Sequence, residues 1–229
     1  MSELLLIAAS GLAREVLAMV RSSGQFDVLG ILDDDVTKLG TVVDGSHVLG
    51  PIGDALNFPN ARVLVCVGAG TGREGVVNRL ASLGFPQERY ATALDPTVRT
   101  PEGCEIGRGS ILLSNVTLTA SVTLGSHVVA MPGVTFTHDD VVADFATFAA
   151  GVSLGGGVRI GRAAYLGMNA SIRERTTVGA GATIGMGAAV LADVPDGEIW
   201  VGVPAHATSH GIHNGKVAHG AAGSGGGSF

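Results

Sequence analysis

The fold is decided by residues 106–190, which read IGRGSILLSNVTLTASVTLGSHVVAMPGVTFTHDDVVADFATFAAGVSLGGGVRIGRAAYLGMNASIRERTTVGAGATIGMGAAV. Every sixth residue of this stretch is apolar, and the register never slips. We call these positions rung residues; they are Ile106, Leu112, Leu118, Leu124, Ala130, Phe136, Val142, Phe148, Leu154, Ile160, Leu166, Ile172, Val178, Ile184 and Val190. A period of six fits neither an amphipathic helix nor an alternating strand.

Two further columns support this period. From Ser110 onward the residue two before each rung is small or β-branched, except at Asp140, and the residue after a rung is often glycine. The pattern predicts a parallel β-helix of hexapeptide repeats, in which three repeats make one eighteen-residue coil and the rung residues point inward. A glycine-rich β-sandwich is the alternative, but its strands would be spaced irregularly.

Composition excludes several classes of function. The chain of 229 residues has a net charge of −6 and no basic run, which argues against a nucleic-acid partner. It has no apolar run of about 18 residues and no signal-peptide pattern, so we expect no membrane span and no export. Cys66 and Cys104 lack the spacing of a metal motif, and we expect free thiols in a reducing cytoplasm.

The first part of the chain alternates strands and helices. We predict strands over residues 4–9, 28–32 and 62–67 and helices over residues 12–22 and 73–83. These lengths favour a small parallel α/β domain, Rossmann-like in layout, over residues 1–94.

Ligands of such sheets bind at the carboxyl ends of the strands. Those ends carry Ser10-Gly11, Asp33-Asp34 and Gly68-Ala69-Gly70. The glycine fingerprint of a dinucleotide site is absent after the first strand. A short loop at a helix N-terminus can still hold a phosphate through backbone N–H groups, and a plain tight turn is the alternative.

Prolines at 96 and 101 mark a junction, so we place the β-helix in residues 95–205. Residues 206–229 are rich in His, Gly and Ser, and we expect a flexible tail. His206, His210, His213 and His219 lie in it, and we expect no metal-binding role for them.

The repeat that follows Phe136 carries the most reactive side chains. In an eighteen-residue coil, His138 belongs to the column Ala120, His138, Gly156, Glu174, so the glycine backbone lies about 4.8 Å beyond the histidine. A histidine base beside a backbone N–H donor suits chemistry at an acyl carbonyl. Either Asp139 or Asp140 is expected to fix the imidazole tautomer. A solvated surface histidine is the alternative.

His127 is expected near a different corner, without comparable carboxylate neighbours.

These features together resemble the bacterial NeuD/PglD-type sugar acetyltransferases of the hexapeptide-repeat superfamily. The resemblance covers about residues 3–205 and implies that the β-helix is left-handed. It rests on Ser10-Gly11 with Glu15-Val16, Leu32-Asp33-Asp34-Asp35, Val48-Leu49-Gly50, His138-Asp139 followed by Asp144-Phe145, and the closing Gly202-Val203-Pro204-Ala205.

The resemblance implies acetyl-CoA as donor, no metal, and a homotrimer with active sites between β-helices. His138 then corresponds to the general base, Asp139 to the carboxylate beside it, and Gly156 to the amide facing the thioester oxygen. Met168 and Met186, one coil apart, correspond to positions along the pantetheine arm.

The sequence departs from the family pattern at two places, one on the acetyl-CoA side and one on the side of the sugar acceptor. Thr147 stands on the cofactor side, where some relatives have a second histidine, and Leu12-Ala13 replace a His-Gly type pair. In the first domain, the residues that correspond to the nucleotide-sugar site are Ser10, Gly11, Asp33, Asp34 and Gly50.

We therefore expect a cytoplasmic acetyl-CoA-dependent sugar acetyltransferase, with a nucleotide-linked amino sugar or a sialic-acid-like sugar as acceptor. A non-catalytic sugar-nucleotide-binding relative and an acyltransferase for a non-sugar acceptor are the alternatives. A zinc enzyme of the γ-carbonic anhydrase type needs three histidine ligands, whereas only His47, His127 and His138 precede residue 206, and only the last two lie in the β-helix.

Overall fold

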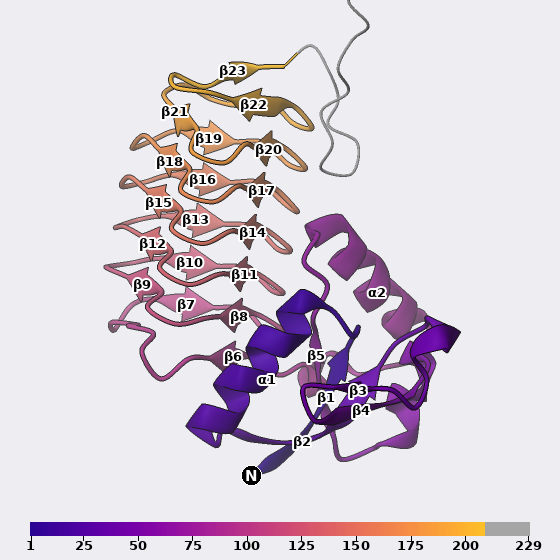
Figure 1. The fold of residues 1–229 in the computed structure, drawn as a ribbon. Coiled ribbons are helices and arrows are strands. Elements are labelled where there is room, and N and C mark those ends of the chain that lie inside the picture. The colour runs from indigo at the N-terminus through magenta and orange to yellow at the C-terminus, as the bar shows by residue number, and fades with distance from the viewer. Residues whose placement is uncertain (209–229) are drawn as a thin grey trace, which may run out of the picture.

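The computed structural model describes residues 1–208 and consists of an α/β domain and a β-helix (Figure 1). The first domain contains β1 (Ser2–Ile7), α1 (Gly11–Ser23), β2 (Phe26–Leu32), η1 (Val36–Lys38), β3 (Val42–Val43), β4 (Ser46–Gly50), η2 (Ile52–Asn57), β5 (Arg62–Val65), α2 (Gly70–Ser82) and η3 (Gln87–Arg89). Its sheet has the order β3-β4-β2-β1-β5. Only the β3–β4 pair is antiparallel, which confirms the predicted small parallel α/β domain.

Capping residues and glycines set the ends of the two α-helices. Ser10 caps α1 by accepting a hydrogen bond from the Ala13 N–H at 3.1 Å, and Gly24 ends the helix with φ +63°. The α2 helix begins at Gly70, three residues before the predicted start, because the glycines adopt helical geometry and the Arg73 N–H reaches Ala69 O at 2.9 Å. Within residues 1–208 no helix is both long and apolar enough to cross a membrane.

The second part is a stack of very short strands in three sheets (Figure 1). It begins with β6 (Ala93–Leu94) and ends with β22 (Ile199–Val201) and β23 (His206–Ala207). The strands between are β7 (Glu105–Ile106), β8 (Ile111–Leu112), β9 (Thr117–Leu118), β10 (Thr123–Leu124), β11 (Val129–Ala130), β12 (Thr135–Phe136), β13 (Val141–Val142), β14 (Thr147–Phe148), β15 (Ser153–Leu154), β16 (Arg159–Ile160), β17 (Tyr165–Leu166), β18 (Ser171–Ile172), β19 (Thr177–Val178), β20 (Thr183–Ile184) and β21 (Ala189–Val190).

The predicted register is confirmed. Each strand from β6 to β18 pairs in parallel with the strand eighteen residues further on, as Thr123 does with Val141. Beyond these strands the spacing shortens, and Thr183 of β20 pairs with Ile199 of β22. The rung residues from Leu112 to Val190 form the buried core, with Phe136 and Phe148 packed edge to face at a ring distance of 4.9 Å. The architecture is the left-handed β-helix of hexapeptide repeats.

The turns repeat with the same period. The third residue after each rung from 106 to 184 has a positive φ, whether or not it is glycine. Glycine directly after a rung has a different reason, as Gly161 shows: a Cβ there would lie 2.4 Å from Ala180 N in the next coil. One glycine column therefore serves close approach, and the other serves the left-handed backbone conformation.

The boundaries of the two parts differ in detail from the expected ones. β6 pairs with β8 in a β-helix sheet, although residues 93 and 94 were expected in the first domain. His206 and Ala207, expected in the tail, form β23, which pairs with β22. The expected tail residues 209–229, with His210, His213 and His219, lie outside the described part of the chain.

A buried arginine joins the two parts. Arg73 of α2 has no solvent exposure and carries no carboxylate partner in any hydrogen bond or ion pair of residues 1–208. Its guanidinium donates at 2.6–3.1 Å to Val67 O and Gly68 O in the first domain and to His127 O, Phe145 O, Ala146 O and Thr147 Oγ1 in the β-helix. This network fixes where the first domain sits against the β-helix.

Candidate active site

The turn between β12 and β13 presents His138 to solvent. Asp139 follows in the left-handed conformation, with φ +63°, and this turns its carboxylate back toward the ring. The His138 Nδ1 and Asp139 Oδ2 atoms are 2.8 Å apart, and both side chains are about two-thirds exposed, at 67% and 68%. A carboxylate on Nδ1 favours the tautomer in which Nε2 carries a free lone pair.

Gly156 lies one coil beyond His138, as the column predicts. A Cβ at this position would lie 2.3 Å from His138 Nε2, so a larger residue would displace the imidazole from its observed position. The structure therefore brings His138, Asp139 and Gly156 together. A base can act there beside a bare peptide backbone, and the roles of these residues stay predictions.

Asp140 does not contact the imidazole through a hydrogen bond. Its carboxylate is fully buried and accepts the backbone N–H groups of Thr137 and Val158, each at 2.8 Å. Burial raises the pKa of Asp140 to about 6, although these two hydrogen bonds oppose the shift. Of the two carboxylates considered for fixing the tautomer, the structure places Asp139 in that position.

The remaining residues expected on the cofactor side lie elsewhere in the same chain. Met168 and Met186 are exposed in the turns after β17 and β20, at a different corner from His138, with Gly187 N donating to Met168 O at 2.8 Å. They stand one coil apart, as predicted. A single chain does not bring them to the histidine.

Thr147 is buried under the first domain and does not lie beside His138. Its hydroxyl donates to Gly68 O at 2.9 Å and accepts from Arg73 at 3.0 Å. Both hydrogen-bonding roles of the hydroxyl are used inside the protein. The structure gives Thr147 a place in the domain junction.

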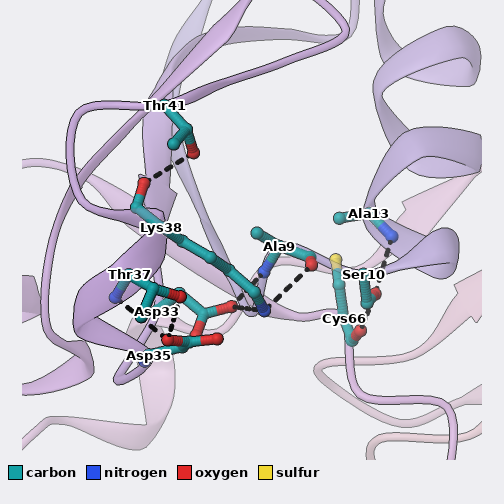
Figure 2. Close-up of polar contacts among 9 residues, drawn as sticks. All are labelled: Ala9, Ser10, Ala13, Asp33, Asp35, Thr37, Lys38, Thr41 and Cys66. Atoms are coloured by element: carbon teal, nitrogen blue, oxygen red, sulfur yellow. Dashed lines mark hydrogen bonds and ion pairs between the residues drawn. The ribbon is translucent and has the colours of Figure 1, made fainter.

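A second cluster lies at the carboxyl ends of β1, β2 and β5 (Figure 2), and Gly50 ends the neighbouring strand β4. The Ser10 hydroxyl donates to Cys66 O at 2.6 Å, which ties the first loop to the end of β5. Asp33 Oδ2 accepts from Ala9 N at 2.7 Å and from Lys38 Nζ at 2.9 Å. Burial alone would raise the pKa of Asp33, but the hydrogen bonds from Lys38 and the backbone outweigh it and hold the pKa below its usual value.

The other predicted residues of this cluster follow the same edge. Asp34 accepts from Ile52 N at 3.1 Å and pairs with Arg79. Gly50 O accepts from Asp33 N at 2.9 Å, and Gly11, the first residue of α1, is open to solvent. The structure thus gathers all five predicted substrate-side residues at one edge of the sheet.

Lys38 is a residue of this edge that the sequence reasoning missed. It reaches Asp33 from η1, and its ammonium also donates to Ala9 O, just before the N-cap of α1, at 3.4 Å (Figure 2). The sequence feature that could have indicated Lys38 is its position, five residues after Asp33.

A cavity of about 140 Å³ lies between the first domain and the β-helix. Leu12 and Gly68 line it from the first domain, and Val129, Met131, Thr147, Ala149 and Tyr165 line it from the β-helix. Leu12, which departs from the family pattern, thus contributes an apolar wall to the space between the two parts.

His127 lies at a different corner from His138, as expected, in the turn between β10 and β11. It is buried between Tyr90 and Phe145, with ring distances of 4.7 and 5.1 Å. Burial, followed by the charge of Arg73, lowers its pKa to about 4, while Asp144 acts in the opposite direction. Among residues 1–208 no carboxylate hydrogen-bonds to its ring, and the buried Nδ1 has no hydrogen-bond partner, unlike Nδ1 of His138.

Metal ligands are not clustered in the described chain. Among residues 1–208 no group of three or more His, Cys, Asp or Glu side chains is arranged to hold a metal ion.

The chain is similar to proteins of known family and structure. Residues 3–80 match the family described as the PglD N-terminal domain. The acetyltransferase domain of PglB from Neisseria gonorrhoeae FA1090, solved in complex with acetyl coenzyme A, is 28% identical with a TM-score of 0.81, over 90% of this chain and 99% of that chain. No curated protein matches the sequence.

Two further solved structures are similar over the same length. PerB from Caulobacter crescentus, in complex with CoA and GDP-perosamine, is 25% identical with a TM-score of 0.82, over 91% of this chain and 98% of that chain. WeeI from Acinetobacter baumannii AYE is 27% identical with a TM-score of 0.77, over 91% of this chain and all of that chain, at 100%. The similarity therefore spans both parts of the fold.

Proposed function

We propose that this chain, an acyltransferase of the hexapeptide-repeat superfamily with a PglD N-terminal domain, transfers the acetyl group of acetyl-CoA to a sugar carried by a nucleotide. The observation that carries the proposal is similarity over both domains to PglB, solved with acetyl coenzyme A, and to PerB, solved with CoA and GDP-perosamine. The acceptor atom is an amine or a hydroxyl of the sugar.

His138 is the general base of the proposed reaction. Its Nε2 takes the proton of the acceptor as the acceptor nitrogen or oxygen attacks the thioester carbonyl. Asp139 holds Nδ1–H at 2.8 Å and stabilises the imidazolium that forms. The Gly156 N–H donates to the oxygen that becomes negative. The C–S bond then breaks, and the proton held on His138 passes to the departing sulfur, which releases the CoA thiol and restores the neutral imidazole.

The nucleotide end of the acceptor is proposed to bind at the edge formed by Ser10, Gly11, Asp33, Asp34 and Gly50. Backbone N–H groups at the start of α1 and the Lys38 ammonium favour a diphosphate there. The cavity beside Leu12 is proposed to receive the sugar, because Leu12 and Gly68 of the first domain line it. Thr147 also lines this cavity and does not lie beside His138 of the same chain, so the base that acts on the sugar comes from the neighbouring chain of the homotrimer proposed below.

A homotrimer is proposed to complete the site. In one chain Met168 and Met186 stand at a different corner from His138. Packing of three β-helices side by side places the methionine corner of one chain beside the histidine corner of the next, so that the acetyl-CoA arm lies between chains. Free Cys66 and Cys104 accord with the reducing cytoplasm, where we place the enzyme.

The test is an assay of acetyl transfer by the purified chain to a panel of nucleotide-linked amino sugars and sialic acids. The released CoA thiol is measured as the readout. His138→Asn is expected to lower kcat by about 10²–10⁴-fold and to leave CoA affinity unchanged by calorimetry. His47→Asn, at an exposed histidine of β4, is the matched control and is expected to keep wild-type kcat.

Three results would contradict parts of the proposal. Full activity of His138→Asn rejects the base. Absence of CoA binding by the wild-type chain favours the non-catalytic alternative. Transfer only to acceptors without a sugar rejects the substrate class. Mass spectrometry after hydroxylamine treatment then separates esters, which are cleaved, from amides, which are not.

A further inference from the structure

The regular hydrogen-bond ladder of the β-helix is interrupted at the turn that carries His138. At the residue after each rung, the backbone N–H donates to a carbonyl of the next coil, as Ala143 does to Ile160 O and Gly155 does to Ile172 O, both at 2.8 Å. Thr137 is the exception among these positions from 107 to 185. Its N–H donates at 2.8 Å to the Asp140 carboxylate, and the pairing of β12 with β15 is limited to Thr135 and Ser153.

Asp140 is also the one charge in a column of small, buried residues. One and two coils away, the same column holds Val122, Val158 and Thr176, all buried. A buried carboxylate is costly unless hydrogen bonds compensate it. Asp140 has two such bonds, one to Thr137 in its own turn and one to the Val158 N–H in the next coil.

The two bonds join the two halves of the candidate active site. Thr137 directly precedes His138, and Val158 lies two residues after Gly156. The Gly157 N–H also donates to His138 O at 2.8 Å. A displacement of either turn would therefore change the separation between the imidazole and the Gly156 backbone, which leaves no room for a Cβ.

Ser110 shows what an uncharged residue does at the corresponding place in another turn. Its hydroxyl accepts from Val128 N at 3.0 Å, eighteen residues ahead, and donates to Gly125 O at 3.1 Å. In that turn the residue after the rung, Gly107, keeps its ladder bond to Leu124 O at 2.8 Å. A serine thus links two coils without opening the ladder, whereas a carboxylate accepts two N–H groups.

We propose that Asp140 is a positioning residue: its buried carboxylate takes the Thr137 N–H out of the ladder and holds the His138 turn in register with the Gly156 turn. The proposal rests on the function proposed for His138 and Gly156. Asp140 itself touches neither acceptor nor donor. It sets the distance between the base and the oxyanion donor, to which catalysis is sensitive at the scale of 1 Å.

The test uses Asp140→Asn and Asp140→Ala in the full-length chain. The amide of Asn keeps the shape and accepts only one of the two N–H groups, while Ala frees both. Both variants are expected to lose about 10–100-fold in kcat and to keep the CoA dissociation constant within about twofold, since no ligand contact changes. In a crystal structure of Asp140→Ala, we expect Thr137 N to bond Leu154 O and the His138 ring to move off Gly156.

Ser110→Ala is the control, because it removes a buried side-chain acceptor at the corresponding position of a turn without a proposed catalytic group. Wild-type kcat in either Asp140 variant overturns the proposal, as does an equal loss of kcat in Ser110→Ala. An unmoved His138 ring in Asp140→Ala overturns it as well. The crystal structure shows whether Asp140 positions the His138 turn even if the wild-type chain transfers no acetyl group. Failure of the proposed function is therefore distinguishable from failure of the positioning role of Asp140.

Discussion

At the scale of the residue, the environment of each histidine decides its chemistry. His138 is exposed and oriented by Asp139, whereas His127 is packed between Tyr90 and Phe145. Burial and the charges of Arg73 and Arg162 lower the pKa of His127 to about 4, and Asp144 only partly offsets them. His127 is therefore neutral in the folded protein at neutral pH.

His127 gives the folded protein a defined acid sensitivity. In the unfolded chain His127 binds a proton with a pKa near 6.5, whereas in the folded chain it does so only near pH 4. The free energy of unfolding therefore falls as the pH falls from about 6.5 to about 4. One such group contributes a slope of at most about 1.4 kcal/mol per pH unit.

Urea unfolding of His127→Asn between pH 4 and 7 tests this. The slope due to His127 is expected to disappear, and Asn tolerates the φ of +57° at this position. His47→Asn controls for the loss of an exposed histidine. Parallel pH curves for wild type and His127→Asn would show that another group carries the sensitivity.

At the scale of the element, the coil depends on glycine for close approach more than for flexibility. A Cβ at Gly161 would meet backbone atoms of the next coil at 2.4–2.7 Å, and backbone cannot move aside cheaply. Gly75, inside α2, has no atom within 4 Å of such a Cβ. The same substitution is therefore expected to have opposite effects at the two sites.

Gly161→Ala is expected to lower the free energy of unfolding by about 1–3 kcal/mol through overpacking. Gly75→Ala is expected to raise it by roughly 1 kcal/mol, because alanine favours an exposed helix interior. Chemical denaturation of both variants measures the difference. Equal effects would mean that the coils separate easily to admit a methyl group.

At the scale of the whole molecule, Arg73 joins the two parts through backbone carbonyl groups and the Thr147 hydroxyl, without a carboxylate partner among residues 1–208. Loss of the guanidinium leaves buried carbonyl groups unpaired on both sides of the junction, and each costs about 1–3 kcal/mol. We expect Arg73→Met to lower stability by at least about 3 kcal/mol and to separate the unfolding of the first domain from that of the β-helix.

Differential scanning calorimetry resolves this as two transitions. Arg79→Met on the same helix is the control, since its ion pair with Asp34 is half exposed and such pairs are worth about 0–1 kcal/mol. A single transition for Arg73→Met, close to the wild-type Tm, would show that other contacts hold the junction.

The sequence predicts the features that follow the six-residue period, and it does not predict contacts between the first domain and the β-helix. Rung residues and the His138–Gly156 column follow from a fixed spacing, so their positions are correct in the structure. Arg73 and Thr147 meet across the domain junction, which no spacing encodes, and Thr147 is accordingly found in that junction, not beside His138. Asp140 stood out as a break in its column, but the missing ladder bond at Thr137 is visible only in the backbone.

The eighteen-residue register also has a genetic consequence. Duplication or loss of one whole coil leaves every other strand paired as before, so the gene can lengthen or shorten the stack in such units without redesigning the remainder. A single-codon insertion inside a strand would move every following rung residue out of its interior position. Length variation among descendants of this sequence should therefore come in whole coils, or as loops extruded at the corners.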